Sequence, residues 1–180
     1  TRKINQLENS IEELKRCSYN SDGALHKLSE ENINLKKSIR DLEVELMECQ
    51  QYTRRESLVI SGIPDNVAQD RLEETVLDIL REVGLHRISS YEVVAVHRLA
   101  RKDNSKWPAR TIIRFTNRRY VQYALENKSK LFGLRKTLKM NLRFYESLCS
   151  ANQKILHVCG ELKKSEYIED FYLRNGFVKI

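Results

Sequence analysis

Two adjacent arginines, Arg54 and Arg55, stand where a helical pattern gives way to a strand pattern, in QQYTRRESLVISGIP (50–64). Arginine is always charged and offers a planar set of donors that matches phosphate oxygens. Contact with a polyanion is therefore one interpretation of the pair. The other is that both cations stabilise the last helical turn through its dipole, by about 0.3–1 kcal/mol each. We favour phosphate contact, because the basic part of the chain starts here.

The charge of the chain is unevenly distributed. Its 180 residues carry a net charge of +7. Residues 1–53 hold 8 basic and 10 acidic residues, residues 54–143 hold 19 and 10, and residues 144–180 hold 5 of each. The middle segment therefore has a net charge of +9, which fits a polyanion partner better than a generic need for solubility.

Residues that catalyse reactions or bind metals form no recognisable set. The four cysteines, Cys17, Cys49, Cys149 and Cys159, have no C-x-x-C spacing and no histidine at metal-ligand intervals. We expect reduced thiols in an intracellular protein, and no metal site. His97 has no acid or nucleophile at informative spacing, so we expect a packed strand residue. Without a phosphate-binding glycine loop or a nucleophile signature, we expect neither an enzyme nor a cofactor.

A heptad repeat occupies residues 1–54, which we predict to be a parallel coiled coil. With Ile4 at position a, the frame holds for seven heptads without a shift. The alternative, one amphipathic helix packed on a globular core, would leave about fifty residues with a single partner surface. The predicted seam residues are Ile4, Leu7, Ile11, Leu14, Leu25, Leu28, Asn32, Leu35, Ile39, Leu42 and Leu46.

The seam has one polar interruption and an open oligomer state. The stretch SYNSDG (18–23) predicts either a helical hairpin or a weak, hinged layer of one helix, and the preserved frame favours the layer. Ile at a, Leu at d and Asn32 at a favour two strands. KINQLE (3–8), with Lys3 at g and Glu8 at e, resembles instead the Arg-led pattern of trimeric coils. Thr1 lies inside the repeat, so we expect the chain to be a fragment.

Residues 55–143 alternate strand and helix patterns. Strands are predicted in ESLVIS (56–61), YEVVAVHRLA (91–100), RTIIRFT (110–116) and TLKMNLR (137–143). One helix is predicted in DRLEETVLDILREVG (70–84), with Asp70 as its cap and Gly84 as its stop, and a second begins after Asn117. The order β-α-β-β-α-β is the ferredoxin-like arrangement, in which one face of the sheet packs on two helices.

The open face of such a sheet is where RNA-recognition motifs (RRMs) stack bases on aromatic side chains. Here the outward positions of the first strand are Val59 and Ser61, and those of the third are Arg110, Ile112 and Arg114. The aromatic stacking positions are therefore missing. We expect that the sheet does not read bases in the usual way.

Residues 144–180 predict a small α/β domain of one helix and a hairpin. The hairpin is expected to turn at Asn175 and Gly176, the preferred pair for a tight turn. The segment is too small to fold alone. We therefore expect it either to pack on the preceding domain or to complete a third, truncated lobe. The helix is expected over residues 147–164, with an apolar stripe of Leu148, Ala151, Ile155, Val158 and Leu162. The predicted fold class is thus α+β: a long parallel coiled coil, an RRM-like domain and a small C-terminal α/β domain.

Four segments resemble the first-open-reading-frame proteins of LINE-type (non-LTR) retrotransposons and the related baculovirus few-polyhedra (FP) proteins. They are QYTRRESLVISGIPD, VHRLARK, WPARTIIRFTNR and YLRNGFVKI, spread in order from Gln51 to Ile180. The resemblance implies a coiled-coil trimer that coats single-stranded RNA and acts as a nucleic-acid chaperone. It also matches Arg98, Arg101, Arg110 and Arg114 to basic family positions.

Further basic residues are candidates for phosphate contact, although single surface charges are usually only solvated. Trp107 could stack a base, but a role in anchoring its loop is the better interpretation. Arg118 and Arg119 open a helix, where a cation opposes the dipole, which indicates an anion nearby. The remaining candidates are Lys102 and Lys106 in a basic loop, Lys136, Lys139 and Arg143 along the fourth strand, and Arg174 beside the terminal turn.

The sequence thus predicts a protein that binds single-stranded nucleic acid, RNA or else DNA, without strong sequence preference. We expect a homo-oligomer, a trimer rather than a dimer, in a cytoplasmic or also nuclear ribonucleoprotein. No apolar run approaches about 18 residues, so no membrane partner is expected. The rival hypothesis is a coiled-coil adaptor, viral or host-domesticated, whose α/β lobes bind protein.

Overall fold

The computed structural model describes residues 2–101, 106–138 and 140–180. It is an α+β structure with one long helix, a four-stranded antiparallel sheet and several shorter helices. It divides into two compact units, Thr1–Leu46 and Met47–Ile180. None of the described helices has the length and hydropathy that a membrane span requires.

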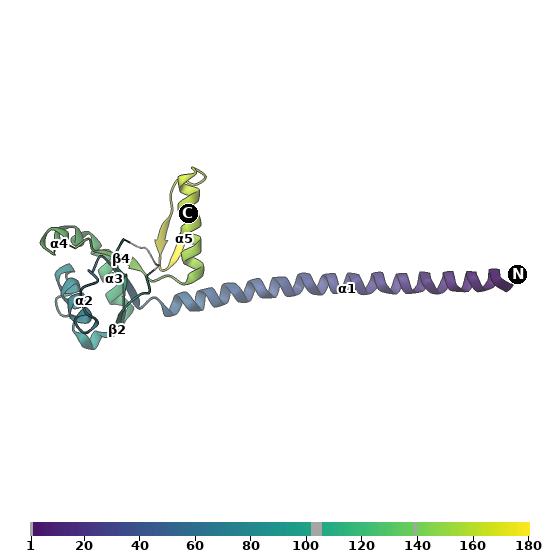
Figure 1. Cartoon of the computed structure of the whole chain (residues 1–180), viewed down its shortest axis with the longest axis horizontal. Coiled ribbons are helices and arrows are strands. Elements are labelled where there is room, and N and C mark those ends of the chain that lie inside the picture. Colours follow the sequence, from purple (N-terminus) through teal and green to yellow (C-terminus); the bar gives the residue numbers. More distant parts are fainter. Residues whose placement is uncertain (1, 102–105, 139) are drawn as a thin grey trace. The chain divides into compact units, whose positions relative to one another are not determined.

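The long helix α1 runs from Arg2 to Thr53 as one continuous element (Figure 1). It passes through residues 18–23 without a break, so the alternative of a helical hairpin is wrong. The apolar heptad residues lie in water in the single chain: Leu28 is 61% exposed and Leu35 63%. An amphipathic stripe of this kind is stable only when another surface covers it.

The second unit contains the sheet, its helices and the C-terminal segment. The strands of the sheet are β1 (Ser57–Ser61), β2 (Val93–Arg98), β3 (Thr111–Phe115) and β4 (Arg143–Glu146). Helices α2 (Gln69–Val83), α3 (Arg118–Glu126) and α4 (Leu131–Leu138) connect them, with short 3-10 turns η1 (Ser90–Glu92) and η2 (Lys128–Lys130). Helix α5 (Ser150–Lys164) and the hairpin of β5 (Tyr172–Arg174) and β6 (Phe177–Lys179) follow.

The sheet has the strand order β2-β3-β1-β4, and all neighbouring strands are antiparallel. Along the central strand, Val59 lies opposite Ile112 on one side and Tyr145 on the other. Leu58 and Ile60 alternate with Val59 and point to the opposite face, as the pleat requires.

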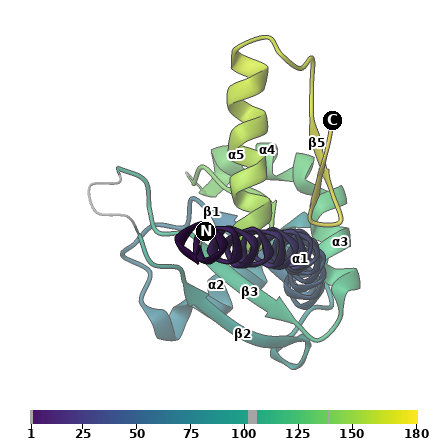
Figure 2. The same ribbon diagram turned by 90° about the vertical axis from the view of Figure 1, so that its right-hand side faces the viewer.

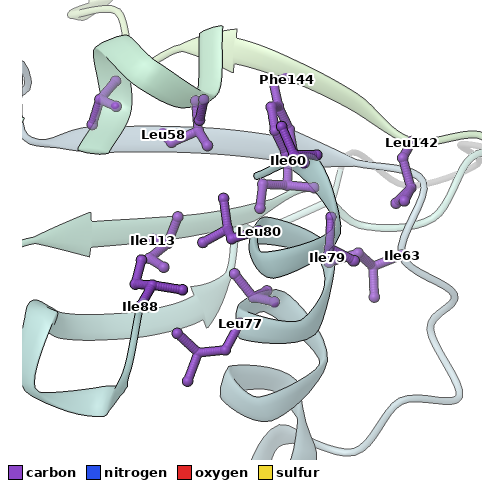
Figure 3. Packing of buried hydrophobic residues seen from close by; sticks show 14 of the residues in the cluster. Leu58, Ile60, Ile63, Leu77, Ile79, Leu80, Ile88, Ile113, Leu142 and Phe144 are labelled. Carbon is purple, nitrogen blue, oxygen red and sulfur yellow. The ribbon is translucent and has the colours of Figure 1, made fainter. Parts of the chain in front are cut away.

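The hydrophobic core lies between the sheet and helices α2 and α3. Figure 3 shows Leu58, Ile60 and Ile113 from the strands meeting Leu80 from α2. All four side chains are completely buried. Helices therefore cover one face of the sheet, as the alternation in the first strand predicts.

The sequence predicts two of three helix ends correctly. Gly84 ends α2 with φ of 121°, a conformation that glycine adopts without a steric penalty. Asn117 caps α3, its side chain accepting a hydrogen bond from the backbone N–H of Arg119 at 2.9 Å. Asp70, however, does not cap α2, which already begins at Gln69 after Ala68. Asp70 lies in the first turn instead, where its charge still favours the helix dipole.

The predicted fourth strand, 137–143, is wrong. Leu131–Leu138 is helix α4, and the strand runs from Arg143 to Glu146. The physical reason is helical spacing. Leu131 is 2% exposed and belongs to the core, and Leu134 packs against it one turn later, so these residues bury their apolar side as a helix. The strand begins only after Leu142.

The C-terminal segment has the predicted hairpin and part of the predicted helix face. Asn175 and Gly176 both have positive φ, 54° and 83°, as a tight two-residue turn demands. Helix α5 starts at residue 150 rather than 147. Of the expected stripe, Ile155 and Val158 remain 42% and 51% exposed, while the buried residues of α5 include Asn152. Leu148 is buried, and Ala151 and Leu162 are half-buried, so the predicted stripe is wrong at Ile155 and Val158 only. Buried Asn152 belongs instead to a polar network.

That network is centred on Gln51, which is only 1% exposed near the end of α1. Its side-chain amide donates to the carbonyl of Ser147 at 2.9 Å and accepts from the N–H of Cys149 at 2.9 Å and the amide of Asn152 at 3.2 Å. Asn152 donates in turn to the carbonyl of Gly176 at 2.8 Å. One polar side chain thus joins the end of α1, the start of α5 and the terminal hairpin, which lie close together in Figure 2.

Candidate nucleic-acid interface

The sheet face that turns away from the helices carries one row of residues across all four strands. Tyr145, Val59, Ile112 and His97 are successive partners in this row, one from each strand. Tyr145 is 38% exposed and Val59 8%, so the tyrosine stands at the surface beside a buried apolar neighbour. We call this face, with the outward residues of its four strands, the open face.

Three arginines flank this row. Arg143 of β4 lies opposite Ser61 at one end of β1, and Arg114 of β3 lies opposite Ser57 at the other end. Arg110, just before β3, places its guanidinium 5.7 Å from the ring centre of Tyr145. All three arginines are exposed, so the open face presents cations on both sides of its apolar row.

The outward strand positions of the open face include no acidic residue. Glu56, one residue before β1, forms an ion pair of 3.5 Å with Arg114. The side chain of Arg114 is 54% exposed and that of Glu56 is 41% exposed. Such exposed ion pairs contribute only about 0–1 kcal/mol to stability. The arginines therefore keep their capacity to bind another anion.

The turn after α1 holds the arginine pair near the Arg114 end of the open face. Arg54 is exposed in this turn. Arg55 lies over the ring of Tyr52, 5.1 Å from its centre, and its buried Nε has no hydrogen-bond partner among the described residues. The two neighbours thus differ: Arg54 is presented to solvent, and Arg55 is partly packed.

Arg98 and Arg101 both lie near Asp65 but have different surroundings. The guanidinium of Arg98 donates to the carbonyls of Ile63, Pro64 and Ala109 at 2.5–3.1 Å, and its side chain is 17% exposed. Arg101 is 49% exposed and pairs with Asp65 at 3.0 Å. Arg98 therefore anchors the connection between β2 and β3, whereas Arg101 remains at its surface.

The other sequence candidates lie apart from the open face or cannot be placed. Arg118 and Arg119 are exposed on α3, in the helical layer, and Arg174 is exposed on β5. Lys106 is exposed in the loop before β3. Lys102 and Lys139 lie outside the described residues, and the side chain of Lys136 in α4 does too.

Hydrogen bonds between Ser89 and Glu92 fix the backbone just before β2. The backbone N–H and the hydroxyl of Ser89 donate to the carboxylate of Glu92 at 2.8 and 2.5 Å. These hydrogen bonds, the side-chain one foremost, lower the pKa of Glu92. The carboxylate of Glu92, next to the start of β2, is therefore already bound by Ser89.

Tyr145 is a residue of this face that the sequence does not predict. The fourth strand predicted from the sequence ends at residue 143, so Tyr145 lies outside it. The signal was present in RFYE (143–146), where buried Phe144 alternates with exposed Arg143 and Tyr145. The described residues bring no three His, Cys, Asp or Glu side chains together that could hold a metal ion.

Comparisons with known proteins identify no family. No family model matches the chain, and no curated protein matches it. Among solved structures it is similar to one titled "Structure of Mip6 RRM3 Domain", with 16% identity over 52% of this chain and 94% of that chain, and a TM-score of 0.33.

Proposed function

We propose that this protein binds single-stranded nucleic acid, RNA in the first place, through the open face and without strong sequence preference. The proposal rests on the open face itself. Arg110, Arg114 and Arg143 flank its central row of residues, and none of its outward strand positions is acidic. Phosphate contacts supply most of the affinity of nonspecific binding, because they release counterions. Exposed arginines of this kind position a strand without reading its bases.

The element order supports an RRM-like domain of the ferredoxin type that begins at residue 55 and includes β4, so it ends at Glu146 rather than at residue 143. The order β1-α2-β2-β3-α3-β4 and the sheet order β2-β3-β1-β4 fit that arrangement. α4 is an addition to it. In such a domain the face without helices is free to meet a nucleic acid.

We further propose that α1 assembles several chains as a parallel coiled coil, a trimer by preference. The support is the exposed heptad stripe, with Ile4, Leu14 and Leu25 among residues that are 59%, 69% and 60% exposed in the single chain. Chains joined in this way present several open faces to one strand. Linked sites rebind as a unit, so avidity can reach about a hundredfold or more.

The sequence resemblance supports the biological setting. Similarity to LINE-type first-open-reading-frame proteins and FP proteins indicates a nucleic-acid chaperone within a ribonucleoprotein, cytoplasmic or also nuclear. The rival adaptor function predicts a different behaviour. An adaptor that binds only protein should elute from heparin resin at low salt, and the purified protein should show no nucleic-acid absorbance.

The test measures the salt dependence of binding to a labelled single-stranded RNA by the full chain. The triple variant Arg110→Ala, Arg114→Ala, Arg143→Ala removes the cations of the open face. A matched triple, Arg71→Ala, Arg87→Ala, Lys128→Ala, removes three exposed cations from the helical side. The open-face variant should lose affinity, and its slope of log K against log salt should flatten by about 0.7 for each lost contact on a single strand.

The matched variant should bind with nearly the wild-type slope. Equal losses in both variants would show that net charge, not the open face, determines binding. Absence of binding by the wild-type chain at low salt would reject the proposed function outright. Both variants should retain the wild-type melting temperature, because the six side chains are exposed.

A further inference from the structure

The open face has an aromatic side chain where the sequence predicts none. Tyr145 stands on β4, an edge strand of the sheet, and its partner across β1 is Val59. The positions on the two central strands hold no aromatic residue: Ser57 and Val59 on β1, Ile112 and Arg114 on β3. On the outward positions of the sheet, rings are therefore found on the two edge strands, as Tyr145 of β4 and His97 of β2.

The surroundings of Tyr145 fit a flat, uncharged ring rather than a side chain of the protein. Its neighbour Val59 is buried, at 8% exposed, and half-buried Ile112 is the next residue of the row. Tyr145 itself is 38% exposed. A nucleobase laid on the exposed ring of the tyrosine would lie beside apolar rather than charged neighbours on the central strands, and it would need no specific edge contacts.

Arg110 places a cation beside this surface. Its guanidinium is 5.7 Å from the ring centre, near the outer limit of about 6 Å for a cation–π contact. An exposed contact of this kind is weak, about 0.5–1 kcal/mol, so an incoming base can displace the guanidinium. The arginine then remains within reach of the phosphate of the same nucleotide, and Arg143 flanks the row on the same strand as the tyrosine.

We propose that Tyr145 forms a base-stacking subsite for one nucleotide of a single strand, with Arg110 as its phosphate partner. This inference rests on the proposed function, which it makes more specific: the ligand must be unpaired, because a paired base cannot place its face on the ring. Stacking on an aromatic tolerates every base, since all bases have a π-face. The subsite therefore adds affinity for single strands over duplexes without adding sequence preference.

The experiment compares two probes of equal length and charge: a single-stranded oligonucleotide with all its bases, and an abasic strand with the same phosphates. The full wild-type chain should bind the strand with bases about fivefold or more tightly, as expected for one stacked base. Tyr145→Ala should remove this preference and leave the affinity for the abasic strand unchanged. Tyr145→Phe, which keeps the ring, should preserve the preference.

Each other outcome overturns a different statement. If the wild type binds both probes equally, the stacking subsite is wrong while phosphate binding stands. If it binds neither probe, the proposed function fails. Tyr167→Ala is the matched control, since it removes an exposed tyrosine outside the sheet. A loss of preference in that variant, or in Tyr145→Phe, would also contradict a stacking role for the ring of Tyr145.

Discussion

At the scale of single residues, the basic candidates differ in what their charges already contact. Arg110 and Arg143 are exposed on the open face, and their charges are accessible to an anion. Arg98 is half-buried, and its donors are engaged by backbone carbonyls. Arg54 is exposed in its turn, so it is the better phosphate candidate of its pair, while Arg55 packs on Tyr52. Burial and partners, rather than charge alone, separate binding candidates from structural residues.

We predict that Arg98→Ala destabilises the fold and leaves the salt dependence of nucleic-acid binding unchanged. The substitution leaves the part-buried carbonyls of Ile63, Pro64 and Ala109 without their donor, at a cost of about 1–3 kcal/mol. The measurement is urea unfolding followed by the fluorescence of Trp107, the single tryptophan, which stands two residues before Ala109. Arg98→Lys should also lose stability, because an ammonium cannot reproduce the planar fork. A wild-type stability combined with a flatter salt slope would make Arg98 a binding residue.

At the scale of elements, a polar network joins segments that are distant in the sequence. Gln51 near the end of α1 contacts the start of α5 and, through Asn152, the turn of the hairpin. Gly176 also lies so close to the side chain of Gln51 that a Cβ atom would clash with it. Glu146 of β4 accepts a hydrogen bond from the N–H of Gly176. The strand that carries Tyr145 is therefore connected directly to the C-terminal hairpin.

We predict that Gly176→Ala loosens the hairpin, whereas Gly160→Ala does not. Gly176 has φ of 83° and faces Gln51, so alanine there is both strained and too large. Gly160 lies inside α5 with open space around it, where alanine should stabilise the helix by about 0.5–1 kcal/mol. Hydrogen exchange of residues 172–179 measures the difference, and Gln51→Ala should accelerate it as well. Unchanged exchange in both Gly176→Ala and Gln51→Ala would show that the network does not hold the hairpin.

At the scale of the whole molecule, the exposed stripe of α1 supports our proposal that several chains assemble through this helix. Its residues are leucine and isoleucine at a 3.5-residue spacing, and the apolar surface of such a helix is normally covered by another helix. Assembly would also govern function. A strand that meets several open faces is held by avidity, so a monomeric variant should bind nucleic acid far more weakly than the oligomer.

We predict that Leu28→Asp with Leu35→Asp converts the oligomer to a monomer and leaves the α/β unit folded. Charged residues at core positions of the seam repel one another and lose burial. The matched control is Ile33→Asp with Val44→Asp, which are 65% and 52% exposed but lie outside the a and d positions. Sedimentation equilibrium should show a monomer for the first variant and the wild-type assembly for the second. A wild-type monomer at micromolar concentration would contradict the coiled coil, and a dimer would contradict only the trimer.

The sequence by itself determined the features that depend on neighbours along the chain. Hydrophobic periodicity predicts α1, α2 and the first three strands, because the 3.5, 3.6 and 2-residue spacings are local properties. The stop at Gly84, the cap at Asn117 and the turn at Asn175 are confirmed for the same reason, since each depends on one residue and its adjacent backbone. The clustering of basic residues after Arg54 was also evident from composition.

Only the tertiary structure decided which residues share a surface. Apolar alternation before residue 143 fits a strand as well as a helix, and the packing of Leu131 into the core selects helix α4. That shift moves the fourth strand forward and brings Tyr145 onto the open face. Arg98 and Gln51 look like ordinary polar residues in the sequence, yet their partners lie 35 and 96 residues away. Long-range contacts of this kind depend on how the whole chain packs, which local periodicity does not encode.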